Sequence, residues 1–115
     1  MKHVMNLHSV PFKMIRSGRK TIELRLYDEK RRLISVGDEI EFVNSSDRRA
    51  YISCLVVALH KFDSFKDLYE GLPLLKCGYT EKDIMTASAD DMNAYYSKEK
   101  QKLYGVLGIE LKLLH

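Results

Sequence analysis

Residues 20–27 read Lys-Thr-Ile-Glu-Leu-Arg-Leu-Tyr, and the predicted fold is organised around this stretch. Apolar side chains alternate along it with polar and charged ones, which is the period of a β-strand with one buried face. The buried face takes Ile22, Leu24 and Leu26, and the opposite face takes Thr21, Glu23, Arg25 and Tyr27. We therefore predict a strand that joins a hydrophobic core on one side and carries charged groups on the other.

Outward from this strand, the pattern predicts further strands and a cluster of helices. Residues 4–7 are apolar enough for a short strand, and a short helix follows, with Pro11 near its start and Gly18 as a left-handed stop. The remaining expected elements are strands at residues 39–43, 51–60 and 104–114 and a helical insertion at about 62–97. This order predicts an α+β fold whose mainly antiparallel sheet curls into a small barrel.

The length and composition indicate one globular domain spanning residues 1–115. The apolar content of 45% and the charged content of 30% are typical of folded proteins, and the chain is long enough to bury one core. No apolar run approaches the ~20 residues that span a bilayer, and the first residues lack the apolar segment of a signal peptide. We therefore expect a cytoplasmic protein that makes no membrane contact.

The cysteines and histidines do not predict a metal or redox site. Cys54 and Cys77 lie 23 residues apart with no CxxC pair, and the four histidines are scattered along the chain. We therefore expect no metal and no cofactor.

Positive charge is concentrated around the predicted strand. The whole chain carries a formal charge of +3, whereas residues 13–32 hold eight basic and three acidic residues, and therefore +5. Such a concentration is typical of an electrostatic footprint for nucleic acid. A solvated charged face explains the same pattern without a ligand, so charge alone leaves both interpretations open.

Three charged residues of this region form the candidate site. Glu23 and Arg25 would lie about 7 Å apart on one strand face, with Lys20 at the start of the strand. An arginine offers a planar fork to a phosphate or a base edge, and a lysine offers a compact charge. Glu23 would orient Arg25 or accept a hydrogen bond from an amino group of the ligand. The alternative is a surface strand whose charges pair with neighbours, worth ~0–1 kcal/mol each.

Three motifs resemble the ASCH domain, a branch of the PUA-like superfamily. The pattern G-x-K-x-x-E-x-R spans residues 18–25, D-x-K-R spans 28–31, and G-D-x-I-x-F spans 37–42. The resemblance covers nearly the whole chain, and three motifs in this order are more specific than any one of them. The resemblance implies a small β-barrel flanked by helices, with a cleft beside the barrel.

The resemblance also implies a ligand and the residues that meet it. The usual proposal for the family is RNA binding, so the expected partner is RNA or a nucleotide-like ligand. Carried over to this chain, the resemblance places a basic cleft on Lys20, Glu23 and Arg25, its rim on Lys30 and Arg31, and a ring for base stacking at Tyr96. The alternative is that Tyr95 and Tyr96 are core aromatics on a helix.

An enzymatic alternative comes from small relatives of this family. Some resemble amidohydrolases that remove an acyl group from modified cytidine with a lysine, a threonine hydroxyl and a glutamate. This chain keeps the lysine as Lys20 but carries Glu23 where those relatives have the threonine, and Thr21 would face the opposite side of a regular strand. A hydroxyl nucleophile needs a base within hydrogen-bond reach, so the departure weakens this interpretation. Lys20 or Glu23 would then have to activate water directly. An amidohydrolase using Lys20, Glu23 and Thr21 stays the alternative to a binding module.

Overall fold

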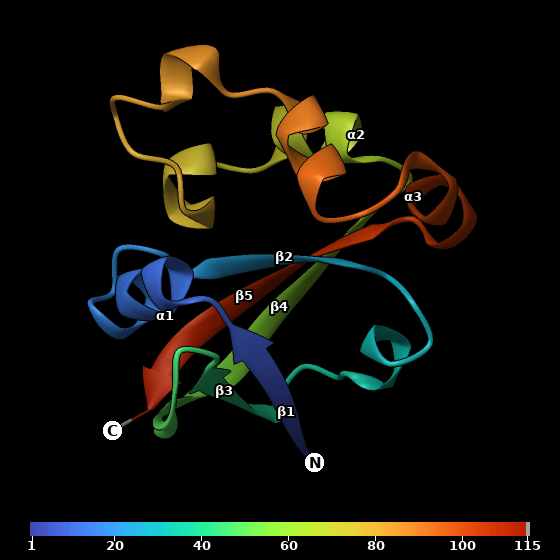
Figure 1. Ribbon diagram of the computed structural model, residues 1–115. Helices are drawn as coiled ribbons and strands as arrows, with labels where there is room; N and C mark the ends of the chain where they lie inside the picture. The colour runs from blue at the N-terminus through green and yellow to red at the C-terminus, as the bar shows by residue number, and fades with distance from the viewer. Residues whose placement is uncertain (115) are drawn as a thin grey trace.

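The strand predicted at residues 21–27 forms β2 (Ile22–Leu26), at one edge of a five-stranded sheet. The computed structural model describes residues 1–114 (Figure 1). The other strands are β1 (Lys2–Leu7), β3 (Glu39–Asn44), β4 (Asp47–Phe62) and β5 (Val106–Leu114). The helices are α1 (Ser9–Arg16), α2 (Phe65–Gly71) and α3 (Lys98–Tyr104), and the 3₁₀ helices are η1 (Arg31–Leu33), η2 (Leu74–Cys77), η3 (Ile84–Thr86) and η4 (Ala89–Ala94).

The sheet is mixed and open. Its strand order is β1-β3-β4-β5-β2, with β1 parallel to β3 and the other neighbouring pairs antiparallel. The expected α+β class and the predominance of antiparallel pairing are confirmed. The predicted small barrel is confirmed in part, because the sheet curls into a half-barrel whose two edges are β1 and β2. A crossover through α1 and β2 connects β1 to β3, which lets these two strands run parallel.

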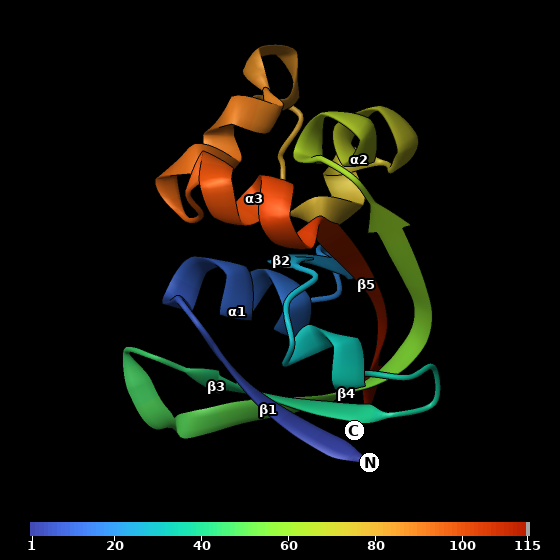
Figure 2. The same ribbon diagram turned by 90° about the vertical axis from the view of Figure 1, so that its right-hand side faces the viewer.

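Helix α1 lies inside the curl of the sheet. Figure 2 shows it between β2 and the side formed by β1 and β3. Phe12 and Ile15 on its inner face are fully buried against core residues of the strands, among them Phe42, Val56 and Ile109. The two edge strands β1 and β2 do not pair, so the half-barrel is open between them. Helix α1 fills this opening, and its apolar side chains complete the core.

The long strand β4 gives the sheet its curl. This 16-residue strand includes the strand predicted at residues 51–60, and it pairs with β3 on one side and with β5 on the other. The register with β5 shifts between Val56 and Ala58. A bulge of this kind bends a strand and increases its twist, which turns the sheet around α1.

The helical segment, residues 63–105 between β4 and β5, covers the apolar face of β2 (Figure 2). Ile22, Leu24 and Leu26 of β2 join a second hydrophobic cluster with Phe65 and Leu68 of α2. Two helices of this segment begin with a hydroxyl residue followed three positions later by an acid: Ser64 accepts a hydrogen bond from the Asp67 N–H, and Ser88 makes a reciprocal capping box with Asp91. No helix within residues 1–114 is long and apolar enough to cross a membrane.

Candidate functional site

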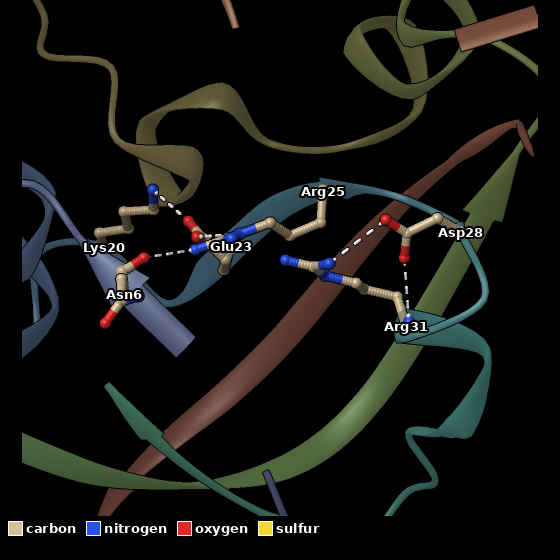
Figure 3. A network of polar contacts seen from close by, with 6 residues as sticks. All are labelled: Asn6, Lys20, Glu23, Arg25, Asp28 and Arg31. Atoms are coloured by element: carbon tan, nitrogen blue, oxygen red, sulfur yellow. Dashed lines mark hydrogen bonds and ion pairs between the residues drawn. The ribbon is translucent and has the colours of Figure 1, made fainter. Parts of the chain in front are cut away.

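The turn before β2 brings Lys20 to the candidate site (Figure 3). The backbone N–H groups of Arg19 and Lys20 both donate to the Met14 carbonyl of α1, so the chain at this point is not yet a strand. Residues three apart on a regular strand face opposite ways. Because the turn interrupts this alternation, Lys20 Nζ reaches Glu23 Oε1 at 2.8 Å.

Glu23 holds two cations at once. Its Oε1 contacts Lys20 Nζ, and its Oε2 accepts a hydrogen bond from Arg25 Nε at 2.8 Å. Glu23 is 4% exposed and Lys20 is 8% exposed. The charged face of β2 is therefore largely enclosed by the protein. The strand runs between the helical segment on one side and α1 with β1 on the other, so both of its faces are covered.

Arg25 joins the two edges of the open sheet. Its Nη2 donates to the Asn6 carbonyl of β1 at 2.9 Å, while its Nε donates to Glu23 (Figure 3). Strands β1 and β2 are not neighbours in the sheet, so this side chain spans the seam, which we define as the gap between these two strands. Hydrogen bonds from a charged donor are roughly twice as strong as neutral ones. The guanidinium of Arg25 thus links β1 and β2, which share no backbone hydrogen bonds as sheet neighbours.

The surrounding charges keep Glu23 ionised. Burial by itself would raise the pKa of Glu23, but the charges of Lys20 and Arg25 and the hydrogen bonds they donate outweigh burial, so the pKa lies below its ordinary value. Burial would lower the pKa of Arg25, and the adjacent Glu23 carboxylate reverses this, so the pKa is raised. The three side chains form a buried cluster in which the carboxylate is a fixed anion and a weak base.

This cluster makes stability depend on pH in the acid range. The pKa of Glu23 is lower in the folded chain than in the unfolded chain, so its stabilisation is present above the unfolded pKa and is lost as the pH falls through the folded pKa. We expect the free energy of unfolding to fall more steeply in acid for the wild type than for Glu23→Gln. Urea unfolding of both proteins from neutral pH to below the ordinary carboxyl range measures the two slopes.

Asp38 provides an internal reference for that comparison. Its hydrogen bond with His3, together with one from the Ser35 backbone, lowers the pKa of Asp38 to about 2. Asp38 titrates in both proteins and so contributes equally to both acid slopes. Parallel slopes for wild type and Glu23→Gln would contradict the assignment of a lowered pKa to Glu23.

The charged cluster forms the floor of a cavity of about 860 Å³, here called the first cavity. One wall comes from Val10, Pro11 and Met14 of α1, and His8 lies beside them. The opposite wall belongs to the helical segment and comprises Tyr69, Cys77, Gly78, Tyr79, Asp83, Thr86, Asp91, Met92, Tyr95 and Tyr96. This volume lies within the range of pockets that hold small ligands.

The lining of the first cavity is not basic as a whole. Lys20 and Arg25 stand against Glu23, Asp83 and Asp91, which gives these five residues a formal charge of −1. A uniformly basic cleft, as expected from the sequence, therefore does not form among residues 1–114. The cations are confined to the floor, and two aspartates lie in the helical wall.

A chain of hydroxyl groups runs along the helical wall. The hydroxyls of Tyr69 and Tyr79 are 2.6 Å apart, and the Tyr79 hydroxyl donates to Asp91 Oδ2 at 2.8 Å. Burial raises the pKa of both tyrosines, which keeps them protonated donors. Sequence reasoning missed this chain. The three residues come from α2, from the loop after η2 and from η4, so no local pattern could have grouped them.

The two adjacent tyrosines differ in their surroundings. Tyr96 lines the first cavity, and its ring stacks on Phe65 with 6.1 Å between centroids, so one ring face is covered by protein. Tyr95 also lines the first cavity but is 67% exposed. The interpretation of Tyr95 as a core aromatic was therefore wrong, because η4 turns its ring outward from both hydrophobic clusters.

The predicted rim residues lie away from the first cavity. Lys30 lines a second cavity of about 560 Å³ at the end of β2. Arg31 lines neither cavity and pairs instead with Asp28, with 3.2 Å between Nη1 and Oδ2 (Figure 3). Of the six predicted binding residues, the fold thus brings four together at the first cavity, namely Lys20, Glu23, Arg25 and Tyr96.

The amidohydrolase alternative gains no specific support from this geometry. Thr21 is absent from the lining of both cavities, and its backbone N–H donates to the Lys76 carbonyl at 2.9 Å. Both oxygens of Glu23 are engaged by cations, which weakens it as a general base. The hydrolase stays an untested prediction, which an assay of acyl-cytidine hydrolysis with the wild type and Lys20→Ala would address.

Comparison with known proteins finds a family profile and solved structures that are similar to this chain. The ASCH domain profile matches residues 5–115. Hypothetical protein PH0355 has a TM-score of 0.82 and 31% identity over 99% of this chain and 100% of its own. Protein PF0455 from Pyrococcus furiosus has a TM-score of 0.70 and 32% identity over 100% of this chain and 99% of its own.

A more distant structure shares the fold alone. The ASCH protein from Zymomonas mobilis has a TM-score of 0.67 and 16% identity, over 95% of this chain and 65% of its own. A search of curated proteins found no match. The profile match nonetheless spans nearly the whole chain and agrees with the three motifs and with the half-barrel flanked by helices. The chain therefore belongs to the ASCH domain family, as the motifs predicted.

Proposed function

We propose that this protein binds single-stranded RNA and seats one nucleotide in the first cavity. One observation carries the proposal: two cations, the buried Lys20 and the half-buried Arg25, are held side by side on the cavity floor by the single carboxylate of Glu23. The two cations carry more N–H donors than their contacts within residues 1–114 use. A phosphate or the acceptor edge of a base would satisfy such donors.

Each floor residue has a distinct role in this proposal. Arg25 offers its remaining guanidinium edge to the ligand, and Lys20 offers a compact charge beside it. Glu23 fixes the positions of both cations, since its two oxygens are already engaged. We therefore assign Glu23 a positioning role, in place of accepting a hydrogen bond from an amino group of the ligand. Tyr96 presents to the ligand the ring face that Phe65 does not cover.

The charge distribution favours a ligand with one phosphate near the floor. The aspartates of the helical wall would repel a dense polyphosphate, whereas their oxygens can accept hydrogen bonds from the amino groups of a base. The ASCH domain family is generally thought to bind RNA, which supports this class of ligand.

Direct binding tests the proposal. We expect a pool of labelled single-stranded RNA to associate at about 50 mM salt, with log affinity falling against log salt by about 0.7 for each phosphate contacted. Fluorescence anisotropy across a salt series measures both quantities. Absence of association at the lowest salt would rule the proposal out, and an affinity independent of salt would rule out phosphate anchoring by Lys20 and Arg25.

A further inference from the structure

The second cavity continues the first along β2. The first cavity is lined by Glu23, Leu24 and Arg25 of this strand, and the second is lined by Leu26 and by the residues that follow it. Figure 1 shows β2 running from the side of α1 toward α3, and α3 contributes Lys100 and Tyr104 to the second cavity. Tyr95 and Tyr96 line both cavities and so form the wall that they share.

We infer that the second cavity is a second nucleotide subsite, which takes the nucleotide adjoining the one in the first cavity. The inference rests on the proposed function and extends it, because it makes the ligand an oligonucleotide and not a free mononucleotide. Its volume of about 560 Å³ is smaller than that of the first cavity but still within the range of small-ligand pockets.

The charges of the second cavity suit a phosphate. Lys30 and Lys100 are exposed cations in its lining, opposed by Asp28 and Glu29. Asp28 is already neutralised, because it accepts hydrogen bonds from the backbone N–H of Arg31 at 3.1 Å and from its guanidinium at 3.2 Å. The three cations Lys30, Lys100 and Arg31 and the two acids Asp28 and Glu29 together carry a formal charge of +1. One bridging phosphate would balance this charge.

In this inference, Tyr95 and Tyr96, which line both cavities, lie between the two consecutive bases of the bound RNA. Tyr95 exposes 67% of its surface at the boundary of the cavities, where an aromatic ring gains from stacking on a base. Burial raises the pKa of the Tyr96 hydroxyl, and the ion pairs Arg25–Glu23 and Arg31–Asp28 also act on it. Because Tyr96 lines both cavities, it lies at the junction that an RNA strand passing from one cavity to the other must cross.

Ligand length separates the two subsites experimentally. Binding of ribonucleoside 5′-monophosphates reports the first cavity, and binding of the matching homotrinucleotides reports both. We expect each trinucleotide to bind at least about tenfold more tightly than its monophosphate, since one further stacked base contributes about 5- to 150-fold. The variant Lys30→Ala/Lys100→Ala should remove most of this ratio and make the salt slope of trinucleotide binding shallower by about 0.7 for each phosphate that is no longer neutralised.

Lys102→Ala is the matched control, because Lys102 is an exposed lysine of α3 outside both linings. It should leave the ratio of trinucleotide to monophosphate affinity unchanged. If monophosphates bind and trinucleotides bind no better, the second subsite is overturned while the proposed function stands. The same holds if Lys102→Ala lowers the ratio as much as the double variant does. If neither ligand binds, the proposed function and the inference both fail.

Discussion

Glu23→Gln should destabilise the protein by about 3–5 kcal/mol, the usual cost of removing one partner from a buried ion pair. The carboxylate is 4% exposed and contacts Lys20 Nζ and Arg25 Nε at 2.8 Å each. An amide leaves two cations close together without a counter-charge, and its NH₂ group can accept from neither of them. For a chain of this size we expect the melting temperature to fall by roughly 10–20 °C.

Glu41→Gln is the matched control for this substitution. Glu41 pairs with the exposed Lys2 at 3.1 Å on the surface of the sheet, where an ion pair is worth about 0–1 kcal/mol. Thermal and urea unfolding should therefore show a loss of unfolding free energy that is severalfold larger for Glu23→Gln than for Glu41→Gln. Equal losses would show that water in the first cavity solvates Lys20 and Arg25, and that Glu23 does not hold them together.

Arg25→Met should weaken both the seam and RNA binding. Methionine cannot donate to Glu23 or to the Asn6 carbonyl, so the variant lacks one charge-assisted hydrogen bond of the buried cluster and the hydrogen bond that links β1 to β2. At about 1.5–3 kcal/mol for each bond to a charged group, we expect stability to fall by about 3–6 kcal/mol. We expect RNA affinity to fall at least about tenfold, because a floor cation is gone.

One further measurement and two further variants distinguish the role of Arg25 from a general loss of charge. Amide hydrogen exchange should accelerate more in β1, which loses its link across the seam, than in the central strand β4. Arg25→Lys should be intermediate in stability, because an ammonium lacks the planar fork that meets two partners at once. Arg19→Met removes an exposed cation from the same segment and should preserve both stability and binding. Full RNA binding by folded Arg25→Met would contradict the proposed anchoring role.

The β2 strand and the family of the chain could both be predicted from the order of the residues. Alternation of apolar and charged residues is a local property, so the strand and its apolar face could be predicted without knowledge of their neighbours. The spacing of Lys20, Glu23 and Arg25 within the first motif likewise indicated that these residues act together. The caps at Ser64 and Ser88 followed from hydroxyl and acid residues three positions apart.

The burial of the charged face, in contrast, depends on tertiary packing. Glu23 and Lys20 are enclosed because α1 and a helical segment more than forty residues away cover β2 from both sides, and no local pattern encodes that distance. The bond from Arg25 to Asn6 joins residues 19 apart across strands that do not pair. The aspartates that cancel the basic character of the cavity enter from that same helical segment. Local periodicity specifies which faces are apolar, whereas the meeting of distant faces depends on how the whole chain packs.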